Sequence, residues 1–377
     1  MGKNNDDKKR GCFGTIIVLI LSVLALLGLL SMSLCVLSSY INPQHFAWTA
    51  LFGLAFWGIL LFNIVILVLM IFLRSRTICI TILALLVAIP GFTKSFAFGK
   101  GAEAEQTLKV MTYNVHNFKH IEGKMEPDVM AADVMELVKK QNPDVLCCQE
   151  FSTFQKGLTR PQSIELFRKE IGANYVYYNM KRNYAGNVIF SKYPLQKVAE
   201  DSGFGEENTY GTMALVDAGE KGKFYVACVH LLSYKITDDE IDVLVDTRQR
   251  QDSLEVLGKS LARKLKGAFE LRSDQIQTVL DALPEVKYPL ILCGDFNETP
   301  VSYVYSKMKR AGFVDTFVKV GRGIKPTYAG RLPLLRIDYI WSKNDVKPLN
   351  IKRIRHKVSD HYPLVLEFSL ENNQQTE

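Results

Sequence analysis

The feature that most constrains this chain is a long stretch without charge. Residues 11–73 contain no Lys, Arg, Asp or Glu. A helix that crosses a bilayer needs about 20 predominantly apolar residues. Two segments meet this requirement, at about 13–37 and 47–73, and a third segment at 77–92 is shorter and contains a proline. We therefore predict an all-α membrane anchor over residues 1–98 with two to three transmembrane helices.

Two alternatives for these segments are weaker. A buried helical hairpin in a soluble core does not suit so long a run without charge. A cleaved signal peptide has a shorter apolar core than the first segment, and a second apolar segment follows here. The anchor therefore stays the favoured interpretation.

Basic residues on both sides of these segments predict the orientation of the anchor. Lys8, Lys9 and Arg10 precede the first segment, and Arg74 and Arg76 follow the second. Because cytoplasmic loops are enriched in Lys and Arg, both places are expected in the cytoplasm. The remaining chain is extracytoplasmic if the third segment crosses, and cytoplasmic if that segment only lies on the surface. We expect three crossings, and hence a multi-pass protein of the cell membrane with an extracytoplasmic C-terminal domain.

The net charge of +7 is concentrated in the anchor. The residues up to Lys100 carry +6 of it, so the rest of the chain is nearly neutral. This balance does not favour a general attraction to nucleic acid. The basic run Lys352–Lys357 could contact a phosphate backbone. A solvated edge strand is the stronger interpretation of that run, because charges on an edge strand discourage aggregation.

A linker over residues 99–106 leads into a domain over residues 107–371, and residues 372–377 are predicted to be a tail. Short apolar runs predict strands, and helical periodicity predicts a helix at Asp128–Gln141. A second helix is expected at Ser273–Leu283, with Ser273 as its N-cap. Strand follows strand in the middle of the domain. This order favours mixed or antiparallel sheets over a doubly wound α/β fold.

Polar side chains occur where the predicted strands end. They are Asn114, Glu150, His230, Asp295, Asn297, Asp338, Asp360 and His361. Carboxylate and amide oxygens suit a hard divalent cation such as Mg²⁺. A histidine backed by an aspartate can stay charged and stabilise developing negative charge. The pattern therefore predicts metal-assisted attack of water on phosphorus, although each residue taken alone also has a plain structural role.

Seven segments of the chain resemble, in the same order, the motifs of the endonuclease/exonuclease/phosphatase superfamily. That superfamily includes DNase I-like nucleases, abasic-site endonucleases, sphingomyelinases and inositol phosphatases. The segments are Met111–Val115, Asp144–Glu150, Gly186–Pro194, Val229–Leu231, Gly294–Asn297, Arg336–Ile340 and Ser359–Leu364. The resemblance implies an α/β fold, a four-layer αββα sandwich of two mixed sheets, and Mg²⁺ or Mn²⁺ as cofactor.

The resemblance also implies a role for each matching residue. The implied catalytic residues are His230, Asp295, Asn297, Asp338 and His361. The implied metal-side residues are Asn114, Glu150 and Asp360. The implied substrate-binding residues are Asn187 and Arg272. In DNase I-like nucleases a glutamate orients the counterpart of His230, whereas this chain has Tyr184-Ala185-Gly186-Asn187 in that region, without an acid.

These inferences predict a membrane-anchored, divalent-metal-dependent phosphoesterase that hydrolyses a phosphodiester or a phosphomonoester. One alternative is an extracytoplasmic nuclease that acts on nucleic acid. The other is an inactive membrane module that binds a phosphorylated partner. The expected partners are the membrane and a phosphoester substrate, which could be a lipid, a small molecule or a nucleic acid.

Overall fold

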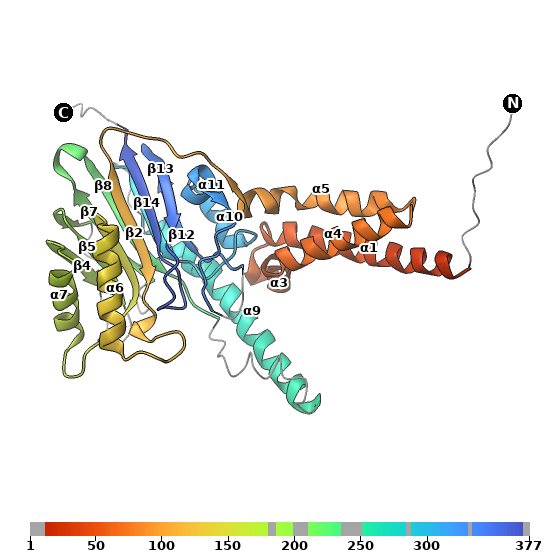
Figure 1. The fold of residues 1–377 in the computed structure, drawn as a ribbon, viewed down its shortest axis with the longest axis horizontal. Coiled ribbons are helices and arrows are strands. Elements are labelled where there is room, and N and C mark those ends of the chain that lie inside the picture. The colour runs from red at the N-terminus through yellow and green to blue at the C-terminus, as the bar shows by residue number, and fades with distance from the viewer. Residues whose placement is uncertain are drawn as a thin grey trace.

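The computed structural model describes residues 12–179, 186–198, 210–234, 251–283, 288–330 and 334–371. The predicted tail and the basic residues that precede the first apolar segment lie outside this part of the chain. The described chain forms an N-terminal bundle of helices and a larger α/β domain at one end of it (Figure 1).

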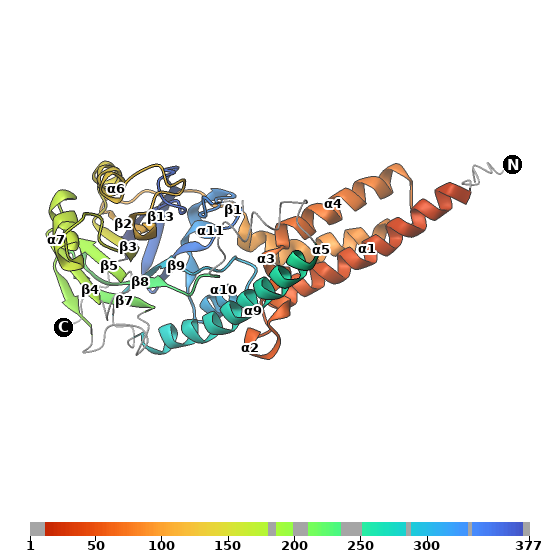
Figure 2. The same cartoon turned by 90° about the horizontal axis from the view of Figure 1, so that it is seen from below.

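Three long apolar helices run side by side in the bundle (Figures 1 and 2). They are α1 (Cys12–Ser38), α4 (Phe56–Phe72) and α5 (Ile78–Ser95). Large apolar side chains are exposed on the outside of the bundle, among them Leu19 (65%) and Phe72 (80%). By length and composition two of the helices could cross a membrane. The bundle therefore suggests membrane association, because such a surface is unfavourable in water.

The second predicted span is not one straight helix. A short helix, α2 (Pro43–Phe46), is followed by α3 (Trp48–Leu54), and α3 meets α4 at an angle of 66°. Counted as one broken span, this pair would raise the number of crossings to three.

Two six-stranded sheets form the centre of the α/β domain. The first has the order β13-β14-β2-β3-β5-β4 and the second the order β10-β12-β9-β8-β7-β6. In the first sheet β2 is parallel to β3 and antiparallel to β14, and in the second β8 is parallel to β9 and antiparallel to β7. Both sheets are therefore mixed, as predicted.

The strands of the first sheet are β2 (Leu108–Asn114), β3 (Val145–Phe151), β4 (Tyr175–Asn179), β5 (Gly186–Ser191), β13 (Val346–Arg353) and β14 (Leu364–Leu370). Those of the second are β6 (Leu195–Lys197), β7 (Gly211–Asp217), β8 (Lys223–His230), β9 (Leu290–Asp295), β10 (Val314–Asp315) and β12 (Asp338–Lys343). A separate pair joins β1 (Ala97–Phe98) to β11 (Arg322–Gly323).

Helices cover the outer faces of the two sheets and complete four layers (Figure 1). The first sheet packs against α6 (Pro127–Gln141) and α7 (Arg160–Glu170), and the second against α9 (Gln251–Asp281) and α10 (Tyr303–Arg310). Side chains of both sheets, such as Val110 and Ile291, fill the space between them. The predicted αββα sandwich is thus confirmed. The remaining short helices are η1 (His116–Phe118), η2 (Gly219–Lys221) and α11 (Thr316–Val320).

The helix predicted to begin at Ser273 is wrong in its start. One helix, α9, runs from Gln251 to Asp281, so Ser273 lies in its interior. The Ser273 hydroxyl donates to the carbonyl of Glu270 instead of capping a helix end. A serine can bond either to a preceding helical carbonyl or to a free amide at a helix start, and its type alone does not decide between them.

The bundle packs directly against the α/β domain. The Ser38 hydroxyl donates to the carbonyl of Val301 at 3.2 Å. A Cβ atom on Gly53 would lie 2.1 Å from the same carbonyl oxygen, so only glycine permits this approach. The Lys94 ammonium donates to the Ser306 hydroxyl at 3.1 Å. These contacts join the bundle to the segment that follows β9.

Candidate active site

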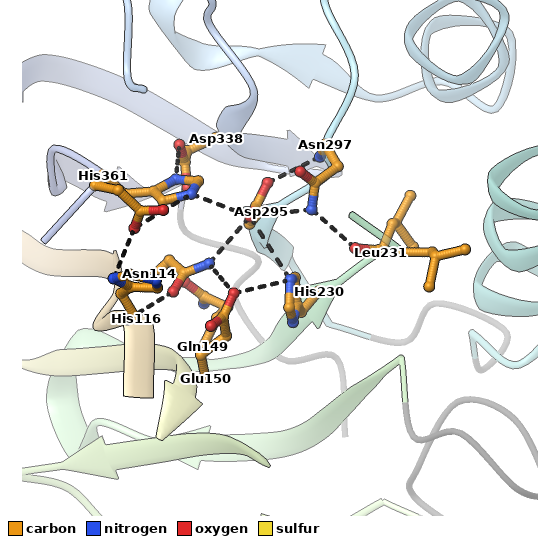
Figure 3. Close-up of polar contacts among 12 residues, drawn as sticks. Asn114, His116, Gln149, Glu150, His230, Leu231, Asp295, Asn297, Asp338 and His361 are labelled. Atoms are coloured by element: carbon orange, nitrogen blue, oxygen red, sulfur yellow. Dashed lines mark hydrogen bonds and ion pairs between the residues drawn. The ribbon is translucent and has the colours of Figure 1, made fainter. Parts of the chain in front are cut away.

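The ends of strands from both sheets converge on one cluster of polar side chains (Figure 3). In the second sheet Asp295 is the register partner of both His230 and Asp338. The first sheet contributes Asn114 and Glu150 from the ends of β2 and β3. The Asn114 amide bridges the two sheets, because its Nδ2 donates to Glu150 Oε1 at 3.0 Å and to Asp295 Oδ2 at 3.1 Å.

The backbone leaves regular strand geometry at this cluster. Glu150 has a φ of 53° and Asn297 a φ of 50°, both in the left-handed region. Gly294 has a φ of 140°, and a Cβ atom there would lie 1.8 Å from the carbonyl oxygen of Val229. Non-glycine residues in this region carry backbone strain, which concentrates at functional sites. Gly294 thus lets β9 lie close enough to β8 to bring Asp295 beside His230.

Glu150 is held by amides and faces a histidine. Its Oε2 accepts from Asn117 Nδ2 at 2.6 Å, and its Oε1 lies 3.5 Å from His230 Nε2. Burial raises the pKa of Glu150, but His230 and the Asn114 amide outweigh burial and lower it below its ordinary value. Glu150 is therefore ionised at neutral pH.

The donor set around Glu150 fits a divalent cation. One ligand atom each from Glu150, His230 and Asp295 lies within 4.8 Å of the others. His230 Nε2 is buried and has no hydrogen-bond partner in the described part of the chain. A buried nitrogen between two carboxylates, with amide groups beside them, offers ligands that Mg²⁺ or Mn²⁺ accepts. The predicted metal requirement is supported at the level of a divalent ion.

A buried Asp–His pair lies on the other side of Asp295. His361 Nδ1 is 2.9 Å from Asp338 Oδ2, and His361 Nε2 is 3.6 Å from Asp295 Oδ2. Burial lowers the pKa of His361, but the carboxylates of Asp338 and Asp295 outweigh burial and raise it well above its ordinary value. His361 is therefore a cation at neutral pH.

Asp295 lies between these two groups and is almost fully buried. Burial raises its pKa to about 6, against the opposing effect of His361. Asn297 holds this carboxylate in place, since its backbone N–H donates to Oδ1 at 2.8 Å and its Nδ2 to Oδ2 at 3.2 Å. The Asn297 side chain also donates to the Leu231 carbonyl at 3.0 Å. An ionised Asp295 can therefore accept a hydrogen bond from a water molecule without moving.

Asp360 lies at the edge of the cluster. Its Oδ1 is 3.7 Å from His116 Nδ1 and 4.0 Å from His361 Nε2. The neighbouring Ser359 hydroxyl donates to the Asn114 carbonyl, which ties this loop to β2. Asp360 therefore contacts histidines rather than Glu150, and its predicted role as a metal-side acid stays a prediction.

The two predicted substrate-binding residues do not lie in the cluster. The Arg272 side chain has no exposed surface, donates to Glu298 Oε1 and the Leu232 carbonyl, and stacks on Tyr234. A guanidinium enclosed in this way supports the site from behind, so the predicted substrate contact of Arg272 is wrong. Asn187 is buried beside the Cys228 thiol, and its role in binding stays a prediction.

Asn117 is a site residue that the sequence prediction missed. It follows β2 in the polar segment Asn114-Val115-His116-Asn117, where a φ of 54° turns its side chain toward Glu150. The excess of Asn and His after one strand was the available signal. The glutamate implied for orienting His230 falls in a region where Tyr184 and Ala185 lie outside the described residues, and Glu150 contacts His230 instead.

The chain matches the model of the Endonuclease/Exonuclease/phosphatase family over residues 111–361. The chain belongs to this family. The bundle matches a second family model over residues 15–95, described as a domain of unknown function (DUF8431). No curated protein matches the chain. Family membership indicates a hydrolase fold shared by metal-using phosphatases and nucleases.

Solved structures of this family share the fold. An endonuclease/exonuclease/phosphatase from Beutenbergia cavernae is 18% identical with a TM-score of 0.50, over 71% of this chain and 72% of its own. One from Bacteroides vulgatus is 15% identical with a TM-score of 0.50, over 71% of this chain and all of its own. An AP endonuclease from Archaeoglobus fulgidus is 18% identical with a TM-score of 0.47, over 69% and 98%.

Proposed function

We propose that the protein is a membrane-anchored, divalent-metal-dependent phosphoesterase that hydrolyses a phosphodiester or phosphomonoester with an activated water. The observation that carries this proposal is the meeting of Glu150, Asp295 and His361 in one cluster from two sheets. Residues 1–98 would anchor the protein and residues 107–371 would carry the reaction. The anchor would cross the cell membrane three times and hold the catalytic domain outside the cytoplasm.

Each part of the cluster suits one task in this reaction. Glu150 and Asn114 would hold the divalent ion, which when bound polarises a phosphoryl oxygen and offsets negative charge. Asp295 would orient the attacking water and accept its proton. The Asn297 amide lies beside Asp295 and would donate to a phosphate oxygen. The charged His361, supported by Asp338, would stabilise negative charge as it develops on the phosphoryl group.

The reaction class is tested with the purified full chain in a phosphatidylcholine nanodisc. Hydrolysis of bis(4-nitrophenyl) phosphate in Mg²⁺ should fall about 10²-fold or more in Glu150→Gln and in His361→Asn, the usual loss for a group acting in the transition state. Glu122→Gln is the matched control, because Glu122 is exposed and pairs only with Lys124 in the described chain. Equal rates in all four proteins would reject the enzyme in favour of a binding module.

The substrate class is tested with the same preparation. A panel of DNA, abasic DNA, sphingomyelin, phosphoinositides and nucleotides, with product release as the readout, separates a lipid or small-molecule phosphoesterase from a nuclease. We expect a phospholipid or a small phosphorylated molecule, because the domain outside the anchor is nearly neutral and held at a membrane. Preferred cleavage of nucleic acid would overturn this choice.

A further inference from the structure

A crevice opens where the helical bundle meets the α/β domain. It has a volume of about 370 Å³ including the open space at its mouth. Leu54, Phe56 and Trp57 line it from the bent junction of α3 and α4, and Pro300 lines it from the segment after β9. Neither the proposed reaction nor the metal cluster uses this crevice.

The walls that come from the bundle are apolar and lie at a membrane boundary. The bend of 66° between α3 and α4 lies at the end of the bundle that contacts the domain. Trp48 is 41% exposed on α3, and Trp57 packs edge to face against Phe92 at 6.1 Å. Tryptophan side chains collect at the level of lipid headgroups. The crevice therefore opens at the level where the phosphates of one leaflet lie.

The walls that come from the domain carry positive charge. Lys325 lines the crevice, is half-buried, and has no ion-pair partner in the part of the chain that the structure describes. Arg336 lines it as well and is 4% exposed. Its Nη2 donates to Asp315 and to the Lys94 carbonyl, whereas its Nε and Nη1 have no hydrogen-bond partner among the described residues. Buried N–H groups without a partner cost free energy unless a ligand or water accepts from them.

We infer that this crevice binds an anionic phospholipid of the surrounding leaflet. The lipid phosphate would accept hydrogen bonds from Lys325 and Arg336, and the acyl chains would extend past Leu54 and Trp57 into the bilayer. A choline headgroup adds a positive charge beside Lys325, so a lipid such as phosphatidylglycerol is preferred over phosphatidylcholine. The inference rests on the bundle spanning a membrane and does not rest on catalysis.

Occupation of the crevice would also affect the metal cluster. Arg336 is two residues before Asp338, and its carbonyl accepts from the Tyr339 hydroxyl, which also donates to the Glu298 carbonyl next to Asn297. A phosphate on Arg336 thus acts on the segments that carry Asp338 and Asn297. Anionic lipid should therefore raise turnover of a soluble substrate about fivefold, the lower end of typical coupling between two sites.

Quenching of tryptophan fluorescence by brominated lipids tests binding directly. The chain has three tryptophans, and Trp48→Phe leaves Trp57 in the crevice and Trp341, which is fully buried. In phosphatidylcholine nanodiscs this protein is titrated with brominated phosphatidylglycerol or brominated phosphatidylcholine. We expect half-maximal quenching at about fivefold less brominated phosphatidylglycerol. Equal quenching by the two lipids would overturn the inference.

The matched variants are Lys325→Gln and Lys347→Gln, both in the Trp48→Phe background. Lys325→Gln should abolish the preference for phosphatidylglycerol, whereas Lys347→Gln, on the exposed strand β13, should keep it. A preference that survives Lys325→Gln would also overturn the inference. Because quenching needs no turnover, it gives an answer even if the protein hydrolyses nothing. If the protein is active, a rate that does not differ between the two lipids contradicts the coupling.

Discussion

The two sheets contribute unlike halves to one site. The first sheet supplies Glu150, and the second sheet supplies His230 beside it; these side chains are 20% and 23% exposed. The other half, Asp295, Asp338 and His361, is only 1% to 6% exposed. The difference separates an open half, where a cation and substrate can exchange, from a closed half with fixed charges. A fixed, water-poor arrangement of charges stabilises a transition state most effectively.

The largest effect is expected where the two halves meet. Asp295 contacts Asn114, His230 and His361, so Asp295→Asn removes the charge that both halves share. We expect kcat/KM to fall about 10³-fold or more, within the range for loss of a general base. Steady-state kinetics with bis(4-nitrophenyl) phosphate measure this loss, and the exposed Asp128→Asn is the control. A fall of less than tenfold would show that the halves do not act together.

Metal dependence should separate the halves. Glu150→Gln removes a charge from the open half and should raise the Mg²⁺ concentration for half-maximal activity about 10- to 100-fold. His361→Asn changes the closed half and should lower kcat while this Mg²⁺ concentration stays the same. Titration of activity with Mg²⁺ after treatment with EDTA measures both. The same shift in both variants would contradict the division.

The pH profile should report on the closed half. Asp295 has to lose its proton, so the acid limb of kcat/KM should lie at about pH 6 or lower, since a bound cation favours the carboxylate. Asp338 raises the pKa of His361, so Asp338→Asn lets His361 lose its proton at lower pH. The alkaline limb should then move down by about one pH unit or more.

Asp360→Asn sharpens this test. Asp360 lies 4.0 Å from His361 Nε2, farther than Asp338 Oδ2 lies from Nδ1, and contributes less to the raised pKa of His361. Its alkaline limb should therefore move in the same direction by a smaller amount. A larger movement than in Asp338→Asn would contradict the assignment of the Asp–His pair.

The smallest effect on turnover is expected behind the closed half. Arg272→Met leaves Glu298 buried without its partner and should lower the free energy of unfolding by about 3–5 kcal/mol. Thermal unfolding of the full chain in detergent measures this loss, with turnover below the unfolding temperature within a few-fold of the parent. The double variant Arg272→Met/Glu298→Gln should recover most of the stability. No recovery would mean that the arginine acts through packing alone.

The sequence predicted the sandwich and the polar cluster for related reasons. Strand positions follow from local apolar runs, and family motifs fix which strand ends carry Asn114, Glu150 and Asp295. Their approach across two sheets follows from the fold. The roles of these residues stay predictions, because proximity alone does not assign a task.

Features that depend on distant contacts were beyond the sequence. Arg336 pairs with Asp315 rather than with the nearby Asp338, since the fold brings residues from separate turns together. The bend between α3 and α4 occurs inside a continuous apolar run, where composition gives no signal. Arg272 resembled a substrate contact by sequence position, and only its complete burial shows otherwise.

The close fit at Gly53 limits how this protein can be divided or recombined. Exchanging the bundle for an unrelated single-span tether would leave the Val301 carbonyl without the Ser38 hydroxyl and the Arg336 guanidinium without the Lys94 carbonyl. Such a chimera would display an apolar scar beside the strand that carries Asp295. Gene fusion and truncation in this lineage should therefore retain or discard the two parts as a unit.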